Sequence, residues 1–421
     1  MRTLPPRGGI TILTRSRTTV GSRRRILELL LARDALSRAE LARLSHLNKP
    51  TVSNLVAGLI DEGIVQEIGS GTSTGGRKPI LLSVRGSGRL VVGLEIDASS
   101  CRLLLVTLHG ERLSMVELPL ERSEVATVVE VVAAGVNSLL TNRDRSTLLG
   151  CGVAVPGLVD PANDTVDSAR RLGWEGTPLR SLLAARLGVP VMVTDRGKAA
   201  ALGELWVLGK ERAHDLIYLY LGRGVAGAIV LGREIHWGAS NIAGEIGHMT
   251  VDPDGPVCAC GNRGCLEAFV STAAIIEQLQ PVLATKRDGP LARALRSDAH
   301  DSDVIAAIGE AATLGDPDAG AVVSSTARWL AIAIAGLINV LNPSVVVLGG
   351  PTAGWGRVLT DAIDHELGQR ALPLSRREVT IVIGHARDLA APLGGAALVL
   401  QRAAGLLAGS EPNDGGRRSV A

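Results

Sequence analysis

The sequence is poor in aromatic residues and in cysteine, and it lacks apolar runs of membrane-spanning length. Only 5 Trp, 2 Tyr and 1 Phe occur among 421 residues, which excludes base stacking on single-stranded nucleic acid as the main activity. The most apolar run, LAIAIAGLINVL from Leu330, is too short to span a bilayer and predicts a buried helix. The basic first 25 residues contain no apolar stretch of the kind found in secretion signals. We therefore expect a cytoplasmic protein that has no membrane partner.

Charge is distributed unevenly along the chain. Residues 1–90 contain 15 Lys and Arg against 6 Asp and Glu, a net charge of +9, whereas the remaining residues carry a net charge of −7. A basic segment joined to an acidic one favours contact between the basic segment and a polyanion. We expect a disordered basic tail over residues 1–21 and a flexible tail over residues 404–421.

Residues 22–85 have the pattern of three helices followed by a hairpin. Apolar residues recur at intervals of three and four in the first helix, and SRAE from Ser37 is a capping box for the second. Asn48 can cap the third helix, which Gly63 ends. Two short strands, IVQEI and ILLSV, flank a polar, glycine-rich loop. This order predicts a winged helix-turn-helix, in which the start of the third helix enters the major groove of double-stranded DNA.

The candidate DNA-binding residues are polar or basic side chains at the start of the third helix and in the hairpin loop. They are Lys49, Thr51, Ser53, Asn54, Arg77 and Lys78. The two loop residues would lie near phosphates or in the minor groove. The alternative is a small helical module that binds another protein, since short amphipathic helices occur in both. The basic charge and the polar helix start favour DNA.

Helical and strand-like segments alternate from about residue 90 to residue 403, which predicts an α/β fold with a substantial sheet. Within this part lies a cluster of one histidine and three cysteines. Its members are His248, Cys258, Cys260 and Cys265. One nitrogen and three sulfur ligands form the set of a closed, four-coordinate zinc site. A disulfide is the alternative, which a reducing compartment disfavours. The other two cysteines, Cys101 and Cys151, lie in apolar strands and are expected to be inert.

The sequence resembles the ROK family of repressors, open reading frames and sugar kinases. The resemblance covers about residues 22–403 and depends on VAVPGLVD, LGW, AALGE, AGEIGHMTVD, CACGNRGCLEAF and LNPSVVVLGG, in the family's order. It implies a winged helix-turn-helix over residues 22–85 and a two-lobed, actin-like body related to hexokinase. Lobe 1 would span residues 90–193, completed by about 385–403, and lobe 2, with the zinc site, would span residues 194–384.

The resemblance also implies a sugar site in the cleft between the lobes. Glu245, His248 and Glu267 match residues that bind sugar hydroxyls in ROK kinases, and Asp195 matches the catalytic aspartate. Fixed carboxylates are good acceptors for hydroxyl groups, although each glutamate taken alone could be a surface charge. With four protein ligands, the zinc of this family motif would be structural and would pin the loop between the two glutamates.

Three positions depart from the family's asparagines. Thr194 and Lys198 flank Asp195, and Arg171 lies in SARRLGW. Both phosphate-binding turns of the family's kinases are altered as well. EIDASS replaces DIGGTK, so that Asp97 stands where a phosphate would lie, and GRGVAGA replaces GTGxGGG. Gly349 and Gly350 keep the shape of an adenosine-side turn, which a tight strand-to-helix connection would equally need. We predict no ATP-dependent kinase activity.

The sequence thus predicts a sugar-responsive, DNA-binding transcriptional regulator, a repressor of carbohydrate-use genes. It would bind a palindromic operator as a homodimer or homotetramer. One alternative is a ROK sugar kinase with a fused regulatory DNA-binding head. Another is an interaction protein whose acidic body is captured by a second protein.

Overall fold

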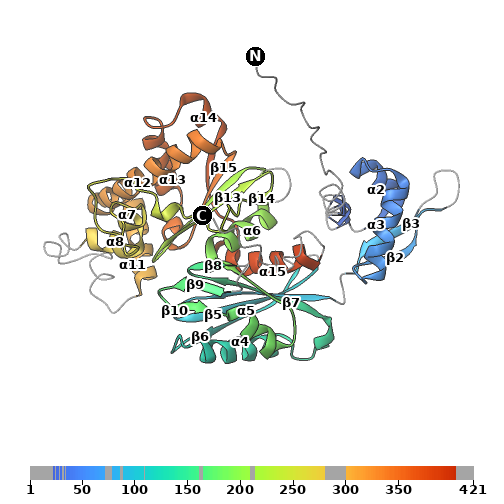
Figure 1. The fold of residues 1–421 in the computed structure, drawn as a ribbon. Helices are drawn as coiled ribbons and strands as arrows, with labels where there is room; N and C mark the ends of the chain where they lie inside the picture. Colours follow the sequence, from blue (N-terminus) through green and yellow to red (C-terminus); the bar gives the residue numbers. More distant parts are fainter. Residues whose placement is uncertain are drawn as a thin grey trace, which may run out of the picture.

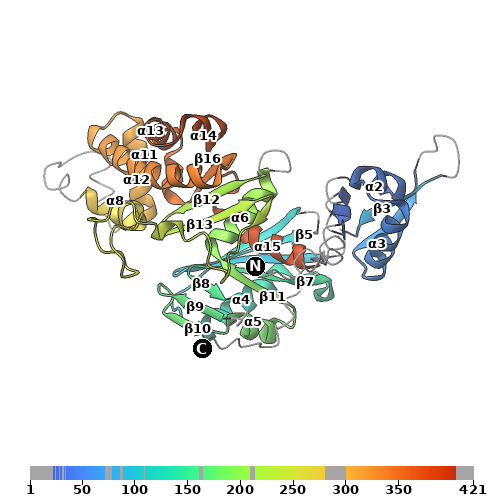
Figure 2. The same cartoon turned by 45° about the horizontal axis from the view of Figure 1, so that its top comes forward.

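The computed structural model describes residues 22–403, apart from 24, 28, 31–32, 34, 72–77, 86–88, 109, 161–164, 209–213 and 280–299. The two expected tails and the wing residue Arg77 lie outside the described residues. A small winged-helix head lies beside a larger body built around two five-stranded sheets (Figures 1 and 2).

The helices of the head begin where their capping residues predict. The side chain of Ser37 accepts the backbone N–H of Glu40, and the Glu40 carboxylate accepts the backbone N–H of Ser37, which confirms the capping box of α2 (Arg38–Ser45). Asn48 caps α3 (Lys49–Asp61) by accepting the N–H of the third helical residue at 2.8 Å. One face of α3 is buried in the head, which leaves its polar start outside.

A three-stranded sheet completes the head. Its order is β1 (Leu36–Ser37), β3 (Ile80–Val84), β2 (Val65–Ser70), and both pairings are antiparallel. The hairpin of β2 and β3 is the predicted wing, whereas β1 has no counterpart among the strands expected from the sequence. The hairpin extends away from the body (Figure 1).

Lobe 1 contains a mixed sheet with helices on both faces. The strand order is β11 (Val191–Asp195), β7 (Leu148–Val155), β4 (Leu90–Ile96), β5 (Ser100–Thr107), β6 (Arg112–Pro119). The first three are parallel, and the last two are antiparallel. Helices α4 (Val125–Leu139) and α5 (Leu179–Leu187) cover one face, and α15 (Ala390–Ala403) covers the other. A smaller antiparallel sheet of β8 (Leu158–Asp160), β9 (Thr165–Ala169) and β10 (Trp174–Thr177) adjoins it, and η1 (Arg145–Thr147) precedes β7.

Lobe 2 has the second five-stranded sheet. The strand order is β14 (Glu234–Ile235), β13 (Val225–Leu231), β12 (Leu216–Leu221), β15 (Val345–Gly349), β16 (Thr380–Ile383). The helical elements of this lobe are α7 (Glu267–Val270), α8 (Thr272–Gln278), α11 (Asp301–Thr313), α12 (Pro317–Leu341), α13 (Arg357–Leu367), α14 (Pro373–Glu378), η2 (Ile246–His248) and η3 (Pro351–Trp355). Helix α12 contains the apolar run from Leu330. By length and composition it could cross a membrane, but 61% of its most apolar window is buried inside the structure, as a core helix would be.

Helices α6 (Arg196–Leu208) and α15 cross between the lobes, and η4 (Arg387–Leu389) leads into α15. Their backbones touch, because a Cβ on Gly203 would lie 2.0 Å from the carbonyl oxygen of Ala390. A Cβ on Gly394 would lie 1.6 Å from that of Ala199. Only glycine permits so close an approach. The crossing therefore fixes the start of α6, directly after Asp195, relative to both lobes.

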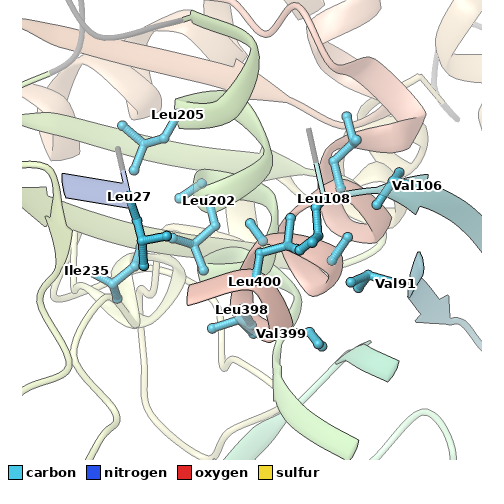
Figure 3. Packing of buried hydrophobic residues seen from close by; sticks show 14 of the residues in the cluster. Leu27, Val91, Val106, Leu108, Leu202, Leu205, Ile235, Leu398, Val399 and Leu400 are labelled. Carbon is cyan, nitrogen blue, oxygen red and sulfur yellow. The ribbon is translucent and has the colours of Figure 1, made fainter. Parts of the chain in front are cut away.

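The head contacts the body through a leucine of its first helical segment. Leu27 is 1% exposed and belongs to the same apolar cluster as residues of α6 and α15. Figure 3 shows Leu27 near Leu202 and Ile235. A shift of α6 or α15 would therefore reach the head through packed side chains.

Candidate functional site

A cavity of about 410 Å³ lies between the lobes, a size typical of small-molecule sites. Residues of β11, of the β9–β10 turn and of lobe 2 line it. The charged or titratable ones are Arg170, Arg171, Asp195, Arg196, Tyr220, Glu245, His248, Cys260 and Glu267. The structure thus places all four predicted sugar-binding residues on the wall of one cavity.

The predicted metal cluster also comes together. The ligand atoms of His248, Cys258, Cys260 and Cys265 all lie within 4.8 Å of one another. The Sγ atoms of Cys260 and Cys265 are 3.7 Å apart, and Cys258 Sγ is 3.8 Å from Nδ1 of His248. With Zn–S bonds of about 2.3 Å, two sulfurs on a tetrahedron are separated by roughly 3.8 Å. The cluster could therefore hold a metal ion.

The backbone of this loop explains its glycines. Two antiparallel bridges, Thr250 to Cys265 and Val257 to Arg263, fold the loop back on itself. At Gly264 the backbone has φ +71°, and an added Cβ would lie 1.5 Å from the carbonyl oxygen of Asp252. No other residue type fits there, because the loop has to close tightly around the four ligand side chains.

Glu267 connects the metal loop to the cavity. Its Oε2 accepts the backbone N–H of Val225 at 2.7 Å, at the start of β13. Its Oε1 lies 4.0 Å from Sγ of Cys258. Glu245 is half-buried in the same wall, and burial, followed by the nearby charge of Asp195, raises the pKa of its carboxyl. Two carboxylates and an imidazole thus lie along one side of the cavity, next to the metal ligands.

The aspartate at the kinase position is paired with a buried lysine. The ammonium Nζ of Lys198 lies 2.6 Å from Oδ2 of Asp195, and the Lys198 backbone N–H donates to Oδ1 at 2.9 Å. The Lys198 side chain is 2% exposed and that of Asp195 is 12% exposed. The resemblance to the ROK family indicated that Lys198 replaces an asparagine. Its ion pair with Asp195 becomes visible only in the folded chain.

A second ion-pair cluster fills the place of the first phosphate turn. Arg196 lies 2.7 Å from Glu95 and 3.0 Å from Asp97, and its guanidinium lies over the ring of Tyr220. Burial raises the pKa of Asp97, but the charge of the Arg196 guanidinium and the hydrogen bond from the backbone N–H of Ala98 together outweigh burial and lower that pKa. For Glu95 burial prevails and raises the pKa. Arg196 and Tyr220 were not among the predicted site residues. The position of Arg196 directly after Asp195 was the only signal in the sequence.

Cys101 and Cys151 are buried in the sheet of lobe 1, as predicted. Burial raises the pKa of each thiol to about 12, so both remain protonated and unreactive at neutral pH.

The start of α3 is open to solvent. Lys49, Ser53 and Asn54 are exposed and Thr51 is half-buried, whereas Val52 on the opposite face is fully buried. Lys78, on the wing, is exposed. This is the arrangement that a groove-binding helix needs, because the residues after the cap are free while the helix is held from behind.

Comparisons with known proteins agree with this architecture. The profile described as the ROK family matches residues 91–402, and that described as the IclR helix-turn-helix domain matches residues 25–69. This chain belongs to the ROK family. The match spans both lobes, from β4 to the end of α15, and the second profile covers most of the head.

Individual ROK relatives cover the same regions. A xylose repressor from Caldicellulosiruptor bescii is 29% identical over 89% of this chain and 94% of its own. The crystal structure of a ROK family transcriptional regulator described as a homologue of the E. coli MLC protein superposes with a TM-score of 0.79 at 24% identity, over 93% and 98% of the two chains. A ROK glucokinase from Streptomyces griseus, solved with glucose and AMPPNP, has a TM-score of 0.64 at 27% identity, over 73% and 98%.

Proposed function

We propose that this chain is a sugar-responsive, DNA-binding transcriptional repressor without kinase activity. The observation that carries the proposal is the junction of two parts in one chain. A head with an exposed helix start is packed through Leu27 onto a body with a polar cavity between its lobes. Relatives named xylose repressors that span most of this chain support a role in transcription. A structural relative solved with glucose supports a sugar in the cavity.

The paired state of Asp195 supports the absence of kinase chemistry. A base that removes a hydroxyl proton has to present a free carboxylate oxygen to it. Here Lys198 contacts one oxygen through its ammonium and the other through its backbone N–H. The carboxylates of Glu95 and Asp97, held by Arg196, occupy the region of the first phosphate turn, where they would repel the phosphates of ATP.

Zinc is the metal that fits the cluster best, because three thiolates and one imidazole in a closed tetrahedron are its usual structural ligands. When bound, it would supply rigidity rather than catalysis, since four protein ligands leave no position for water. Nδ1 of His248 faces Cys258, which leaves Nε2 for a sugar hydroxyl. The loop would hold Glu245, His248 and Glu267 in place to accept or donate hydrogen bonds at one side of the sugar.

The proposed mechanism is a change in the distance between two heads. A sugar bound between the lobes would contact Asp195 and lobe 2 together and so favour a closed cleft. An effector shifts the conformational equilibrium by its difference in affinity for the two states. Because α6 starts at the cavity and touches α15, and both pack near Leu27, closure would move the head. In a homodimer or homotetramer on a palindromic operator, this would alter the spacing of the recognition helices.

Binding to DNA from the chain's own upstream region tests the proposal directly. Fluorescence anisotropy against that duplex and an unrelated duplex, at several salt concentrations, should show specific and salt-dependent affinity. Lys78→Ala should weaken binding to all duplexes alike and reduce the salt slope by about 1. Equal affinity for both duplexes would contradict sequence-specific regulation. A sugar panel that never alters operator affinity would contradict the effector.

The second candidate, a sugar kinase with a regulatory head, is favoured by one observation, the retention of Asp195 in the cavity. A hexose panel with ATP and Mg²⁺ separates the two functions. We expect no phosphorylation above background from the natural chain. We also expect none from Lys198→Asn, because the altered phosphate turns remain.

A further inference from the structure

Three arginines line the cavity and Arg223 precedes the lining residue Gly224; three of these four arginines are engaged. Arg170 donates to the carbonyl oxygen of Ala259 on the metal loop, and Arg196 pairs with Glu95 and Asp97. Arg223 lies 2.9 Å from Asp301 at the rim. The fourth, Arg171, has no hydrogen bond or ion pair with any residue that the structure describes. Arg171 is exposed to solvent, so of the arginines that line the cavity it is the one whose guanidinium can meet a ligand without first breaking a protein contact.

The backbone of Arg171 is held firmly. It lies in the turn between β9 and β10, where the N–H of Leu172 donates to the carbonyl of Ala169 at 2.8 Å. Leu172 is 2% exposed, and the indole of Trp174 donates to the carbonyl of Ser123 at 2.6 Å. The turn is thus anchored in lobe 1 on both sides, and Arg171 projects from a fixed base.

The side chain reaches across the cavity to lobe 2. Its Nη2 lies 3.5 Å from the point where a Cβ on Gly224 would be, and Oε2 of Glu267 lies 2.8 Å from that point. Arg171 therefore ends beside the altered second phosphate turn. Burial, and then the guanidinium groups of Arg223 and Arg196, lower its pKa, while the charges of Glu267 and Asp97 act in the opposite direction.

The nearby carboxylates do not neutralise it by direct contact. Oε2 of Glu267 is used by the N–H of Val225, and Asp195 is neutralised by Lys198. The ordinary kinase arrangement would place the reactive hydroxyl of the sugar near Asp195. In this chain Arg171 and Arg196 line the same cavity as Asp195, and Lys198 is paired with Asp195. An anionic substituent on the sugar is the group that this arrangement can bind.

We propose that the ligand of this cavity is an acidic sugar, a pyranose that carries a carboxylate or a phosphate, and that Arg171 binds this anionic group. The planar guanidinium offers two parallel N–H donors to such a group. Glu245, Glu267 and His248 remain for the hydroxyls on the metal-loop side. The inference rests on the proposed sugar-binding function and specifies its ligand class.

Isothermal titration calorimetry of the full zinc-loaded chain tests it with matched pairs. The pairs are glucuronate with glucose, galacturonate with galactose, and glucose 6-phosphate with glucose, with inorganic phosphate alone as a further probe. We expect at least one acidic member to bind about 10- to 100-fold more tightly than its neutral parent, the range of one charge-assisted contact. The uronate and phosphate arms show which anionic group is recognised.

Arg171→Asn should remove that preference, so that the acidic sugar and its neutral parent bind with similar affinity. Arg186→Asn is the matched control, because Arg186 is an exposed arginine paired with Glu130 on the surface of lobe 1, and it should behave like the natural chain. Neutral sugars that bind as tightly as acidic ones would overturn the inference and leave the proposed function intact. Inorganic phosphate that binds as tightly as the sugar phosphate would also overturn it. If neither class binds, sugar sensing itself fails, and the inference fails with it.

Discussion

The metal loop and the charged centre of the cleft are adjacent but are assembled in different ways. All four metal ligands come from residues 248–265, and two short bridges within that loop bring them together. In the cleft, Asp195, Arg196 and Lys198 are close along the chain at the junction of β11 and α6, but Glu95 and Asp97 reach Arg196 only in the folded lobe. Spacing along the chain therefore indicates the metal site, whereas the ion pairs of Arg196 depend on the topology. Substitutions in the two regions test whether the two sites also differ in how much they contribute to the free energy of unfolding.

The largest effect is expected for Cys265→Ser, because Cys265 is fully buried and is one of the four predicted metal ligands. Loss of a structural metal belongs to the mechanisms that cost more than about 4 kcal/mol. Metal analysis should fall from one zinc per chain to none, and the unfolding temperature should drop. Cys101→Ala, a buried cysteine outside the loop, is the control and should keep the metal. An equimolar zinc content in Cys265→Ser would show that the ligand assignment is wrong.

Acid should weaken the same site. In the absence of metal, burial raises the pKa of Cys265 to about 12, so zinc has to displace a proton to bind the thiolate. As the proton concentration rises, protons compete more strongly with the metal for the thiolate. The zinc affinity, measured by competition with a chelator, should therefore fall as the pH is lowered from 8 to 6. An affinity independent of pH would indicate that the thiols do not bind the metal.

Lys198→Met should have the next largest effect, because it leaves the carboxylate of Asp195 buried without its partner. Breaking a buried pair costs about 3–5 kcal/mol. Chemical denaturation should show this loss, and the double variant Asp195→Asn with Lys198→Met should lose less than the two single variants together. Arg186→Met, from an exposed ion pair with Glu130, should leave the free energy of unfolding unchanged. Additive losses would show that Asp195 and Lys198 are not coupled.

The sequence predicts the features whose determinants are close together along the chain. The capping residues Ser37 and Asn48, the wing and the metal ligands follow from spacing alone, and the structure reproduces the geometry of each. The two lobes follow from the resemblance to the ROK family rather than from periodicity.

Features that depend on side-chain direction could not be predicted. The pairing of Lys198 with Asp195 requires a buried helix start, and the contact of Arg196 with Glu95 requires β4 and β11 to lie in one sheet. Arg171 was visible as a departure from the family's asparagine. Arg171 remains unpaired because Glu267 and Asp195 have other partners in the folded chain. No pattern in the sequence predicts those partners.

The smallest predicted effect separates folding from DNA recognition in the head. Asn48 and Asn54 are both exposed asparagines near the start of α3, but only Asn48 caps the helix. Asn48→Ala should cost about 1 kcal/mol, the usual loss for a cap. Asn54→Ala should leave the unfolding transition of the head unchanged, because the Asn54 side chain makes no capping bond. The same variant should weaken binding to the operator more than to unrelated DNA.

If Asn54→Ala instead weakens binding to every duplex alike, the side chain does not read bases. If Asn48→Ala leaves the stability unchanged, the capping residue read from the sequence does not stabilise α3. Local sequence would then determine the metal loop but not the start of this helix.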